Sequence, residues 1–277
     1  MSRIELKQSY TLPSTSLLVD VVAEQTQLSK SVVKRALTFG GGWVKSVGEK
    51  SLKRCRKAKQ LLKPGDYFEF YYDADLLATL PQQPEPILQT DHWGIWYKPA
   101  NQVSQGSRYG DLNSLEVCVQ RLLNKPVYLV HRLDREARGL LMLAYSSQAA
   151  AALSKIWSTE TLSKRYQARI HGTPPEHHGH IRVELDGKVA HTEYTLASVR
   201  DDGTSLVDIR LHSGRLHQIR RHFAALGHPL TDDPKYGGRP TSDKGLQLVA
   251  VELGFNDPCK LGAPTVRCRL PDRYCLF

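Results

Sequence analysis

The 277-residue chain lacks several features that would assign it to a membrane, secreted or metal-binding class. Its five cysteines form no Cys-x-x-Cys pair and are odd in number, so neither a disulfide framework nor a zinc knuckle is expected. No apolar run approaches the roughly 18 residues that a membrane-spanning helix needs. The first residues alternate charged and apolar side chains, without the apolar stretch of a secretory signal. We therefore expect a cytoplasmic protein with reduced thiols.

Motifs for nucleotide cofactors, serine nucleophiles and metals are also missing. Neither a Gly-x-Gly-x-x-Gly turn nor a P-loop occurs, which argues against dinucleotide or ATP chemistry. No Gly-x-Ser-x-Gly is present either. Residues 176–180 are rich in histidine but lack the His-Glu-x-x-His spacing of a zinc helix, and the adjacent prolines and Gly179 predict an exposed turn. We expect no bound metal and no nucleotide cofactor.

Positive charge is what the sequence has in excess. Lysine and arginine number 38 against 28 aspartate and glutamate, which gives a formal net charge of +10. Each cation that neutralises a phosphate releases a counterion, so such a chain is suited to a polyanionic partner. The stretch from Lys45 to Lys63 holds eight basic residues and one acidic residue. Although a charge run is often only a solvated face, we predict that this region binds RNA.

The N-terminal region is predicted to be a small module of helices and strands. Residues 17–24 and 28–37 carry apolar side chains at helical spacing, and Ser29 or Ser31 is a suitable N-cap for the second helix. Three glycines end that helix, and short strands are expected at 43–45 and at 67–72. The RNA contacts expected from this module are Lys34, Arg35, Lys53 and Arg54.

This order of elements resembles the S4 RNA-binding domain. The residues that carry the resemblance are Leu-Ser-Lys-Ser-x-x-Lys-Arg at 28–35 and Lys-Pro-Gly-Asp at 63–66, while the usual Val-x-Val-Asn-Gly centre is degraded at 43–48. We expect an S4-like domain over residues 1–75. Residues 76–90, with three prolines, are expected to be a linker, and residues 91–277 a larger domain.

One carboxylate of the larger domain lies in an arginine-rich loop. Short apolar strands are predicted at 127–130 and 140–145, and Asp134 lies between them beside Arg132, Arg135 and Arg138. Cationic neighbours favour a charged carboxylate, which suits a nucleophile or an electrostatic stabiliser better than a general acid. Taken alone, such a group is more often a structural ion pair.

Two further segments accompany this loop. Residues 162–172 alternate basic and apolar side chains as a half-exposed strand does, with Tyr166 available to stack on a base. Residues 213–229 predict a turn and then a helix that ends at Gly227. Arginines near the start of that helix are suited to phosphate and to Asp134.

These three segments strongly resemble the RluA-type RNA pseudouridine synthase family. The first motif is His-Arg-Leu-Asp at 131–134, followed by a glycine and an apolar strand. The second is Lys-x-Tyr-x-Ala-x-x-x-Gly at 164–172. The third is Gly-Arg-x-His-Gln-Ile-Arg at 214–220, with Leu-Gly-His-Pro at 226–229 and Asp-Pro-x-Tyr-Gly at 233–237. The motifs stand in the order that the family has.

The resemblance implies an enzyme that isomerises uridine in RNA without cofactor or metal. Asp134 would be the nucleophile, attacking the sugar C1′ or the base C6, or assisting loss of the C2′ proton through a glycal. Tyr166 would stack on the base and help to remove the C5 proton, and Arg220 would pair with Asp134. Leu248 would line the pocket, and Arg132 would fill the place vacated by the extruded base. Other RNA contacts implied by the motifs are His131, Arg135, Arg215, His217 and Gln218.

The prediction is thus an α+β protein, with a small S4-like domain and a larger catalytic domain on a mixed, mostly antiparallel β-sheet with flanking helices. We expect a monomer that acts on ribosomal RNA rather than transfer RNA. At 137–138 the chain has Ala-Arg where the family usually has Thr-Ser or Thr-Glu, and this arginine is a candidate phosphate contact. Two alternatives stay open: a non-catalytic RNA-binding assembly factor, and a hydrolytic RNA N-glycosidase that uses Asp134.

Overall fold

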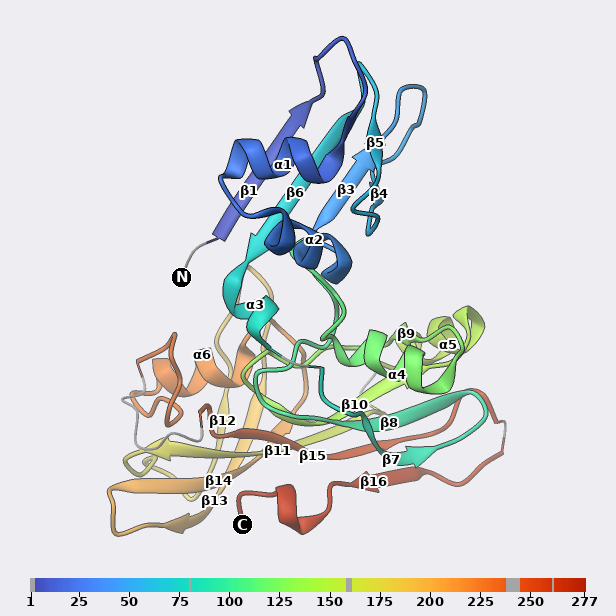
Figure 1. Cartoon of the computed structure of the whole chain (residues 1–277). Coiled ribbons are helices and arrows are strands. Elements are labelled where there is room, and N and C mark those ends of the chain that lie inside the picture. The colour runs from blue at the N-terminus through green and yellow to red at the C-terminus, as the bar shows by residue number, and fades with distance from the viewer. Residues whose placement is uncertain (1–2, 80, 158–160, 238–244, 261) are drawn as a thin grey trace. The chain divides into compact units, whose positions relative to one another are not determined.

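The computed structural model describes residues 3–79, 81–157, 161–237, 245–260 and 262–277 (Figure 1). The fold is α+β and divides into two compact units. The first comprises residues up to 83 together with 105–121, and the second comprises 84–104 and 122–277. The chain therefore enters the second unit, returns to the first for one segment, and leaves it again. The boundaries expected from the sequence contain no such return.

The first unit is built on a four-stranded antiparallel sheet in the order β1-β6-β3-β4. Ser29 is the N-cap of its second helix and accepts from the Val32 amide, and Gly40 ends that helix at φ +98°, as the sequence predicted. The strands are β1 (Arg3–Ser9), β3 (Gly42–Lys45), β4 (Lys53–Arg54) and β6 (Tyr67–Asp73), with β2 (Ser16–Leu17) and β5 (Leu61–Leu62) as a separate pair, and the helices are α1 (Leu18–Thr26), α2 (Lys30–Phe39) and α3 (Ala74–Ala78).

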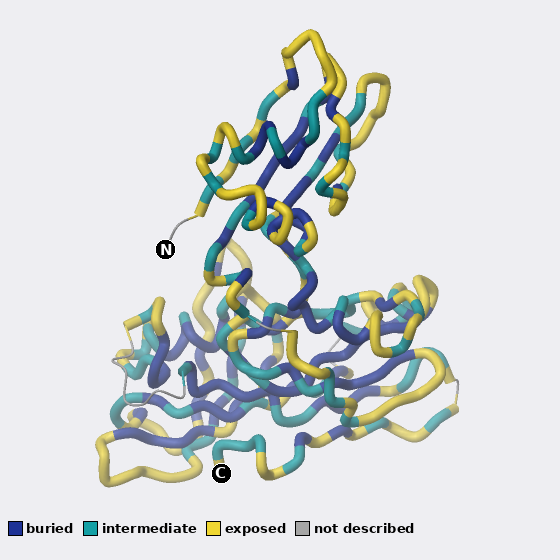
Figure 2. Tube along the Cα trace, viewed as in Figure 1, coloured by how far each residue is buried: buried dark blue, intermediate teal, exposed yellow. Residues whose placement is uncertain are grey.

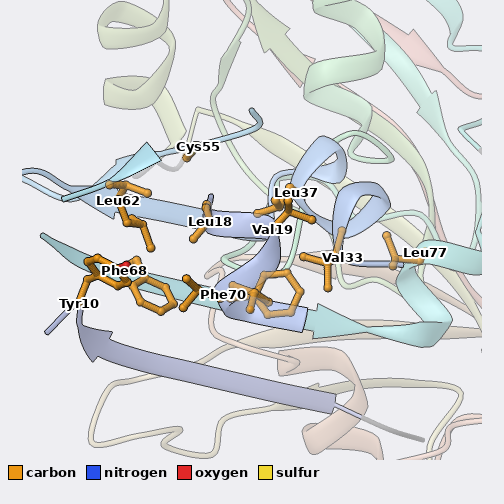
Figure 3. Close-up of a cluster of buried hydrophobic side chains, with 14 residues drawn as sticks. Tyr10, Leu18, Val19, Val33, Leu37, Cys55, Leu62, Phe68, Phe70 and Leu77 are labelled. Atoms are coloured by element: carbon orange, nitrogen blue, oxygen red, sulfur yellow. The ribbon is translucent and has the colours of Figure 1, made fainter. Parts of the chain in front are cut away.

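The core of this unit lies between the two main helices and one face of the sheet. Figure 3 shows Leu18, Val33 and Leu37 from the helices gathered with Phe68 and Phe70 from β6, and each of these side chains has no exposed surface. Such burial of apolar surface is the main stabilising contribution in a module of this size.

The segment expected to be a linker is structured. Residues 76–90 contain the end of α3 and all of β7 (Glu85–Gln89). Pro86 is tolerated in β7 because this strand lies at the edge of the large sheet, where a missing backbone donor can face away from the neighbouring strand. The prolines predicted correctly that this segment would not be a central strand.

The second unit carries one large sheet of ten strands. The path runs β12-β13-β14-β11-β15-β10-β8-β7, with β16 paired to β15 and β9 paired to β10. Among these pairs only β10 with β15 is parallel, which confirms a mixed, mostly antiparallel sheet. The strands not yet given are β8 (Trp93–Lys98), β9 (Tyr128–Leu129), β10 (Arg138–Ala144), β11 (Ser163–His171), β12 (His178–Ile181), β13 (Thr192–Val199), β14 (Thr204–Leu211), β15 (Leu248–Phe255) and β16 (Val266–Arg269).

Four helical segments lie between or after the strands of the large sheet along the chain. They are α4 (Leu115–Leu123), which begins in the returning segment, α5 (Ser147–Trp157), α6 (Gln218–Ala225) and the short 3₁₀ turn η1 (Asp272–Tyr274). Figure 2 shows β10 as an almost continuous buried strand, because it lies between β8 and β15 and is covered on its faces. Among the described residues, no helix has the length and apolarity that crossing a membrane requires.

One local prediction was only partly confirmed. The histidine-rich residues 176–180 were expected in an exposed turn; residues 176–178 and His180 are exposed, but the residues from His178 onward belong to β12, which pairs with β13. Gly179 is buried against the Tyr194 ring, and an added Cβ would lie only 2.6 Å from that ring. The glycine allows close packing against an aromatic side chain rather than a turn.

Candidate active site

The larger unit contains a cavity of about 610 Å³. It is lined by residues 130–134, Ala137, Ser154, Trp157, Lys164, Tyr166, 211–220 and Leu248. These residues come from the loop after β9, the end of α5, strand β11, the turn before α6 and the first residue of β15. Five segments distant in the sequence thus meet at one pocket.

The loop that carries Asp134 is braced on both sides of this residue. The Ser104 hydroxyl donates to the Leu133 carbonyl at 2.9 Å and accepts from the Leu133 amide at 3.1 Å. The Lys98 ammonium donates to the Arg135 carbonyl at 3.1 Å, and also to the carbonyls of Pro99 and Gln102. Lys98 has no exposed surface, and this burial lowers its pKa to about 7 against the opposing influence of Asp134. The loop is therefore held by its backbone, which leaves the Asp134 side chain to face the cavity.

Arg220, in the first turn of α6, is the centre of a cluster of carboxylates. Its Nε and Nη2 donate to the two oxygens of Asp233 at 2.8 and 2.7 Å, while Nη1 lies 3.3 Å from Asp134 Oδ2 and 3.3 Å from Glu136 Oε2. Burial would lower the pKa of Arg220, but the hydrogen bonds and charge of Asp233, with those of Asp134, raise it overall. Burial would likewise raise the pKa of Asp233, which Arg220 lowers. The arginine is therefore a fixed cation beside Asp134.

His217 stands on the other side of Asp134. Its Nε2 lies 3.7 Å from Asp134 Oδ1, and its Nδ1 is 2.9 Å from the Tyr236 hydroxyl. The backbone of His217 has φ +51°, a left-handed conformation that is costly for a residue with a side chain and that is found at functional sites. Burial lowers the pKa of His217, with Asp134 opposing the shift. The imidazole is thus a neutral wall of the pocket at physiological pH.

Tyr166 and Leu248 form the apolar floor. Tyr166 is half-buried on β11, and a register shift between Arg165 and Tyr166 interrupts the pairing with β15 at this point. Such irregularities re-aim side chains next to active sites. Burial first, and the charge of Asp134 second, raise the pKa of Tyr166, so the phenol stays protonated. Leu248 is 4% exposed at the start of β15.

Lys164 and His131 line the far wall of the cavity. Lys164 is only 6% exposed, and burial lowers its pKa. The His131 ring is stacked on Trp157 at 3.9 Å between ring centroids, and its Nε2 accepts from the Met142 amide at 3.0 Å. Burial first, and Lys164 second, lower the pKa of His131 to about 3. His131 is therefore neutral and fixed in orientation.

The structure brings most of the candidate residues together at this cavity. Those that line it are Asp134, Tyr166, Arg220, His131, Arg132, Arg215, His217, Gln218 and Leu248. Arg132 and Arg215 are exposed, as phosphate-binding side chains would be. Gln218 is buried, and it accepts from Ser213 and the Arg215 amide while it donates to His191 and Thr192. It braces the turn before α6, and its polar atoms are already paired.

Other candidates lie elsewhere. Arg135 is exposed and does not line the cavity. Arg138, considered above as a phosphate contact, is half-buried on β10 among Tyr97 and Cys275, and burial lowers its pKa. It is not part of the cavity wall, whereas Ala137 is. Of the two residues at 137–138 that differ from the family's usual pair, Ala137 lines the pocket and Arg138 does not.

The basic candidates of the first unit differ in how free their side chains are. Arg54 donates to the carbonyls of Gly40 and Ser107 and lies over the Trp43 ring, so its guanidinium is engaged in structural contacts. Arg35 donates to the Leu77 carbonyl at 2.6 Å. Lys34 is exposed, and exposed Lys53 pairs with Glu49 on the surface. The two lysines are the members of this set that remain suited to an RNA phosphate.

Several residues of the site were assigned no role from the sequence. Asp233, Lys164 and Lys98 lie in short motifs, but nothing in a motif reveals that a charged side chain will be buried. Glu136 follows Asp134 by two residues, and only the fold shows that both face Arg220. Among the described residues, no group of three or more His, Cys, Asp or Glu is arranged to hold a metal ion. The acidic side chains converge instead on an arginine.

Comparison with known proteins agrees with the motifs. A family model described as RNA pseudouridylate synthase matches residues 92–225, which include Asp134, Tyr166 and Arg220. An RNA pseudouridine synthase of Aquifex aeolicus is 32% identical over 281 residues, an alignment that covers 87% of this chain and 89% of that protein. Two shorter alignments cover 47% and 48% of this chain. YlyB of Bacillus subtilis is 37% identical over 48% of its own length, and the dual-specificity synthase RluA of Vibrio parahaemolyticus is 33% identical over 61%.

A solved structure shares the fold. Human RNA pseudouridylate synthase domain containing 1 superposes with a TM-score of 0.56 at 21% identity, covering 71% of this chain and 87% of that chain. Because the alignment with the Aquifex aeolicus protein runs along most of both chains, and because the motifs at the cavity keep the family's order, this protein belongs to the RluA-type RNA pseudouridine synthases.

Proposed function

We propose that this protein converts specific uridines of structured RNA to pseudouridine, with Asp134 as the nucleophile. The observation that carries the proposal is the contact of Asp134 with the buried cation Arg220 at 3.3 Å, in a cavity whose wall includes the aromatic ring of Tyr166. A fixed cation orients the carboxylate, and an aromatic ring offers a surface for a base. Both needs of the reaction are met in one pocket.

The reaction breaks one bond and forms another on the same nucleotide. The C1′–N1 bond breaks with its electron pair passing to the uracil ring, while Asp134 bonds to C1′ or C6, or assists removal of the C2′ proton. The ring turns, and C5 bonds to C1′ as the Asp134–C1′ bond breaks, or as the C2′ proton returns on the glycal route; a bond from Asp134 to C6 is likewise released. The C5 proton then leaves and N1 gains a proton. Since no electrons enter or leave, the chemistry requires no redox cofactor.

Tyr166 acts in this scheme as a phenol and not as a phenolate. Its raised pKa means that it can accept the C5 proton only while it passes its own proton onward. Asp134, released from the sugar by that stage, is the carboxylate whose charge helps to raise this pKa. We assign the ring to base stacking and the hydroxyl to such a relay.

The RNA must present its target outside the helical stack, since the cavity has room for one nucleotide and not for a duplex. We assign Arg132 to the vacated position and Arg215 to a phosphate contact, because both side chains are exposed and line the cavity. We assign the first unit, as an S4-like domain with Lys34 and Lys53, to RNA contacts outside the pocket. Ribosomal RNA is the favoured substrate, and we expect a monomer in the cytoplasm.

Mapping of pseudouridines tests the proposal. Ribosomal and transfer RNA from a strain that lacks the protein should miss pseudouridine at one or a few positions, and the wild-type gene should restore them. The variant Asp134→Asn should fail to restore them at equal protein level. No missing position in any stable RNA would favour a non-catalytic assembly factor, and release of free uracil by the purified protein would favour an N-glycosidase.

A further inference from the structure

Lys164 is a buried cation at the cavity that has no partner. Its side chain extends from β11 to the cavity wall with 6% exposure. Within the part of the chain that the structure describes, no hydrogen bond or ion pair of its ammonium group is present, and burial is the single cause that shifts its pKa, downward. An uncompensated buried ammonium is costly, and it is retained where a ligand supplies the missing negative charge.

The other cations of the cavity differ from Lys164 in this respect. Arg220 is already engaged by three carboxylates. Arg132 and Arg215 are exposed, where a hydrated phosphate is readily bound. The neighbours of Lys164 on the wall are the neutral His131 and the ring of Trp157. Lys164 therefore lies at a part of the cavity where no carboxylate of the described residues shifts its pKa.

The positions of Lys164 and Tyr166 along β11 indicate that a nucleotide bound at Tyr166 lies near the Lys164 ammonium. Tyr166 is close enough to Asp134 for the carboxylate to raise its pKa, and Lys164 precedes Tyr166 by two residues on the same face of β11. Two residues of strand span about 7 Å. A uracil stacked over Tyr166, with its sugar at Asp134, would occupy a cavity that Lys164 also lines.

We propose that Lys164 stabilises the negative charge that uracil carries once its bond to the sugar is broken. This inference rests on the proposed function. When C1′–N1 breaks, the electron pair is shared by N1 and the two carbonyl oxygens of the ring. The ammonium donates to a carbonyl oxygen without giving up its proton, and the charge is removed when C5 bonds to C1′ and N1 is later protonated.

A flanking phosphate is the less suitable occupant. Phosphate keeps its charge throughout the reaction, so a contact with it would strengthen binding without favouring the transition state. A fixed donor aimed at charge that develops during the reaction acts on the rate instead, and removal of one such donor typically costs about 100-fold or more. The two roles therefore differ in what a substitution changes.

The test compares Lys164→Met, which keeps the length of the side chain, with Lys164→Arg, which keeps the charge. The matched control is Arg165→Met, since Arg165 is the adjacent cation on β11, 56% exposed and 3.8 Å from Glu252. The probes are transcripts of the source organism's ribosomal RNA made with uridine or with 5-fluorouridine. Single-turnover loss of the N1-linked nucleoside at saturating enzyme, RNA affinity and circular dichroism are measured for each variant. Loss of the N1–C1′ bond is the common readout because 5-fluorouridine has no C5 proton to lose and cannot end as pseudouridine.

We expect Lys164→Met to lower the single-turnover rate about 100-fold with unchanged affinity and fold, and Lys164→Arg to recover most of it. With 5-fluorouridine, whose fluorine itself stabilises the ring anion, the loss should be at least tenfold smaller. Weaker affinity at an unchanged rate, or an equal loss on both transcripts, would overturn the inference. If the wild-type protein converts no uridine, the proposed function fails too; if it does and Lys164→Met matches it, the Lys164 role alone fails.

Discussion

Asp134 and Asp233 contact the same arginine, Arg220. Replacement of Asp233 with asparagine should mainly lower stability, and replacement of Asp134 should mainly lower activity. The Asp233 side chain has no exposed surface, and it binds Arg220 through two hydrogen bonds of 2.8 and 2.7 Å. Asp134 is 18% exposed and makes one contact of 3.3 Å. The first carboxylate balances a buried charge, and the second faces the cavity.

The magnitudes follow from these contacts. Asp233→Asn leaves the guanidinium, itself 2% exposed, without its bidentate partner and should lower the free energy of unfolding by about 3–5 kcal/mol. Asp134→Asn removes one weaker hydrogen bond while Asp233 and Glu136 still face Arg220, so the free energy of unfolding should change by about 1 kcal/mol or less. Loss of the nucleophile should nevertheless reduce pseudouridine formation by at least about 10⁴-fold.

Urea unfolding and single-turnover conversion of one RNA measure both quantities in the same preparations. Glu136→Gln is the matched control, because this side chain is 31% exposed and contacts Arg220 at the same 3.3 Å as Asp134. It should leave stability within about 1 kcal/mol and retain activity. Equal destabilisation by the two aspartate variants, or activity in Asp134→Asn, would refute the division of roles.

Three further outcomes are expected. The pKa of His131 is about 3 in the folded chain and 6.5 ordinarily, so between these pH values the unfolded chain binds one proton more than the folded chain. The free energy of unfolding should therefore fall by about 1.4 kcal/mol for each pH unit below 6.5. His131→Gln should flatten this slope in denaturant titrations. Lys98→Met removes the donor shared by three carbonyls and should cost about 3 kcal/mol in urea unfolding. An unchanged unfolding midpoint would contradict the bracing role. Gly139→Ala should give little folded protein by circular dichroism, because at φ +120° its Cβ would lie 2.3 Å from the Ala250 carbonyl; normal folding would contradict this.

Local order was largely predictable from the sequence. Helices at 18–26 and 30–39, expected at 17–24 and 28–37, and strands at 67–73 and 138–144, expected at 67–72 and 140–145, appear close to where apolar patterns and the capping residues placed them. These features depend on neighbouring residues, which a sequence displays directly. The expected contact of Asp134 with Arg220 is also present, because the motifs carry it.

Long-range burial was not predictable in the same way. The return of residues 105–121 to the first unit depends on contacts such as that of Arg108 with Glu69, and no change of composition marks it. Lys98 and Lys164 look like ordinary surface lysines in the sequence, yet both are buried. A buried lysine requires acceptors supplied by distant segments, or a ligand, and neither is visible in a local pattern.

The unequal geometry around Arg220 explains how a nucleophile can be both fixed and reactive. A carboxylate bound bidentately by a buried arginine has its lone pairs occupied, as those of Asp233 are. Asp134 shares a single Nη1 with Glu136 at longer range, so an oxygen remains free to approach a sugar or base. In the proposed reaction, Asp134 loses its charge on bonding to the nucleotide, and Asp233 and Glu136 then still compensate the arginine. The cation need not move during the reaction, and a fixed cation is what lowers the cost of reorganisation.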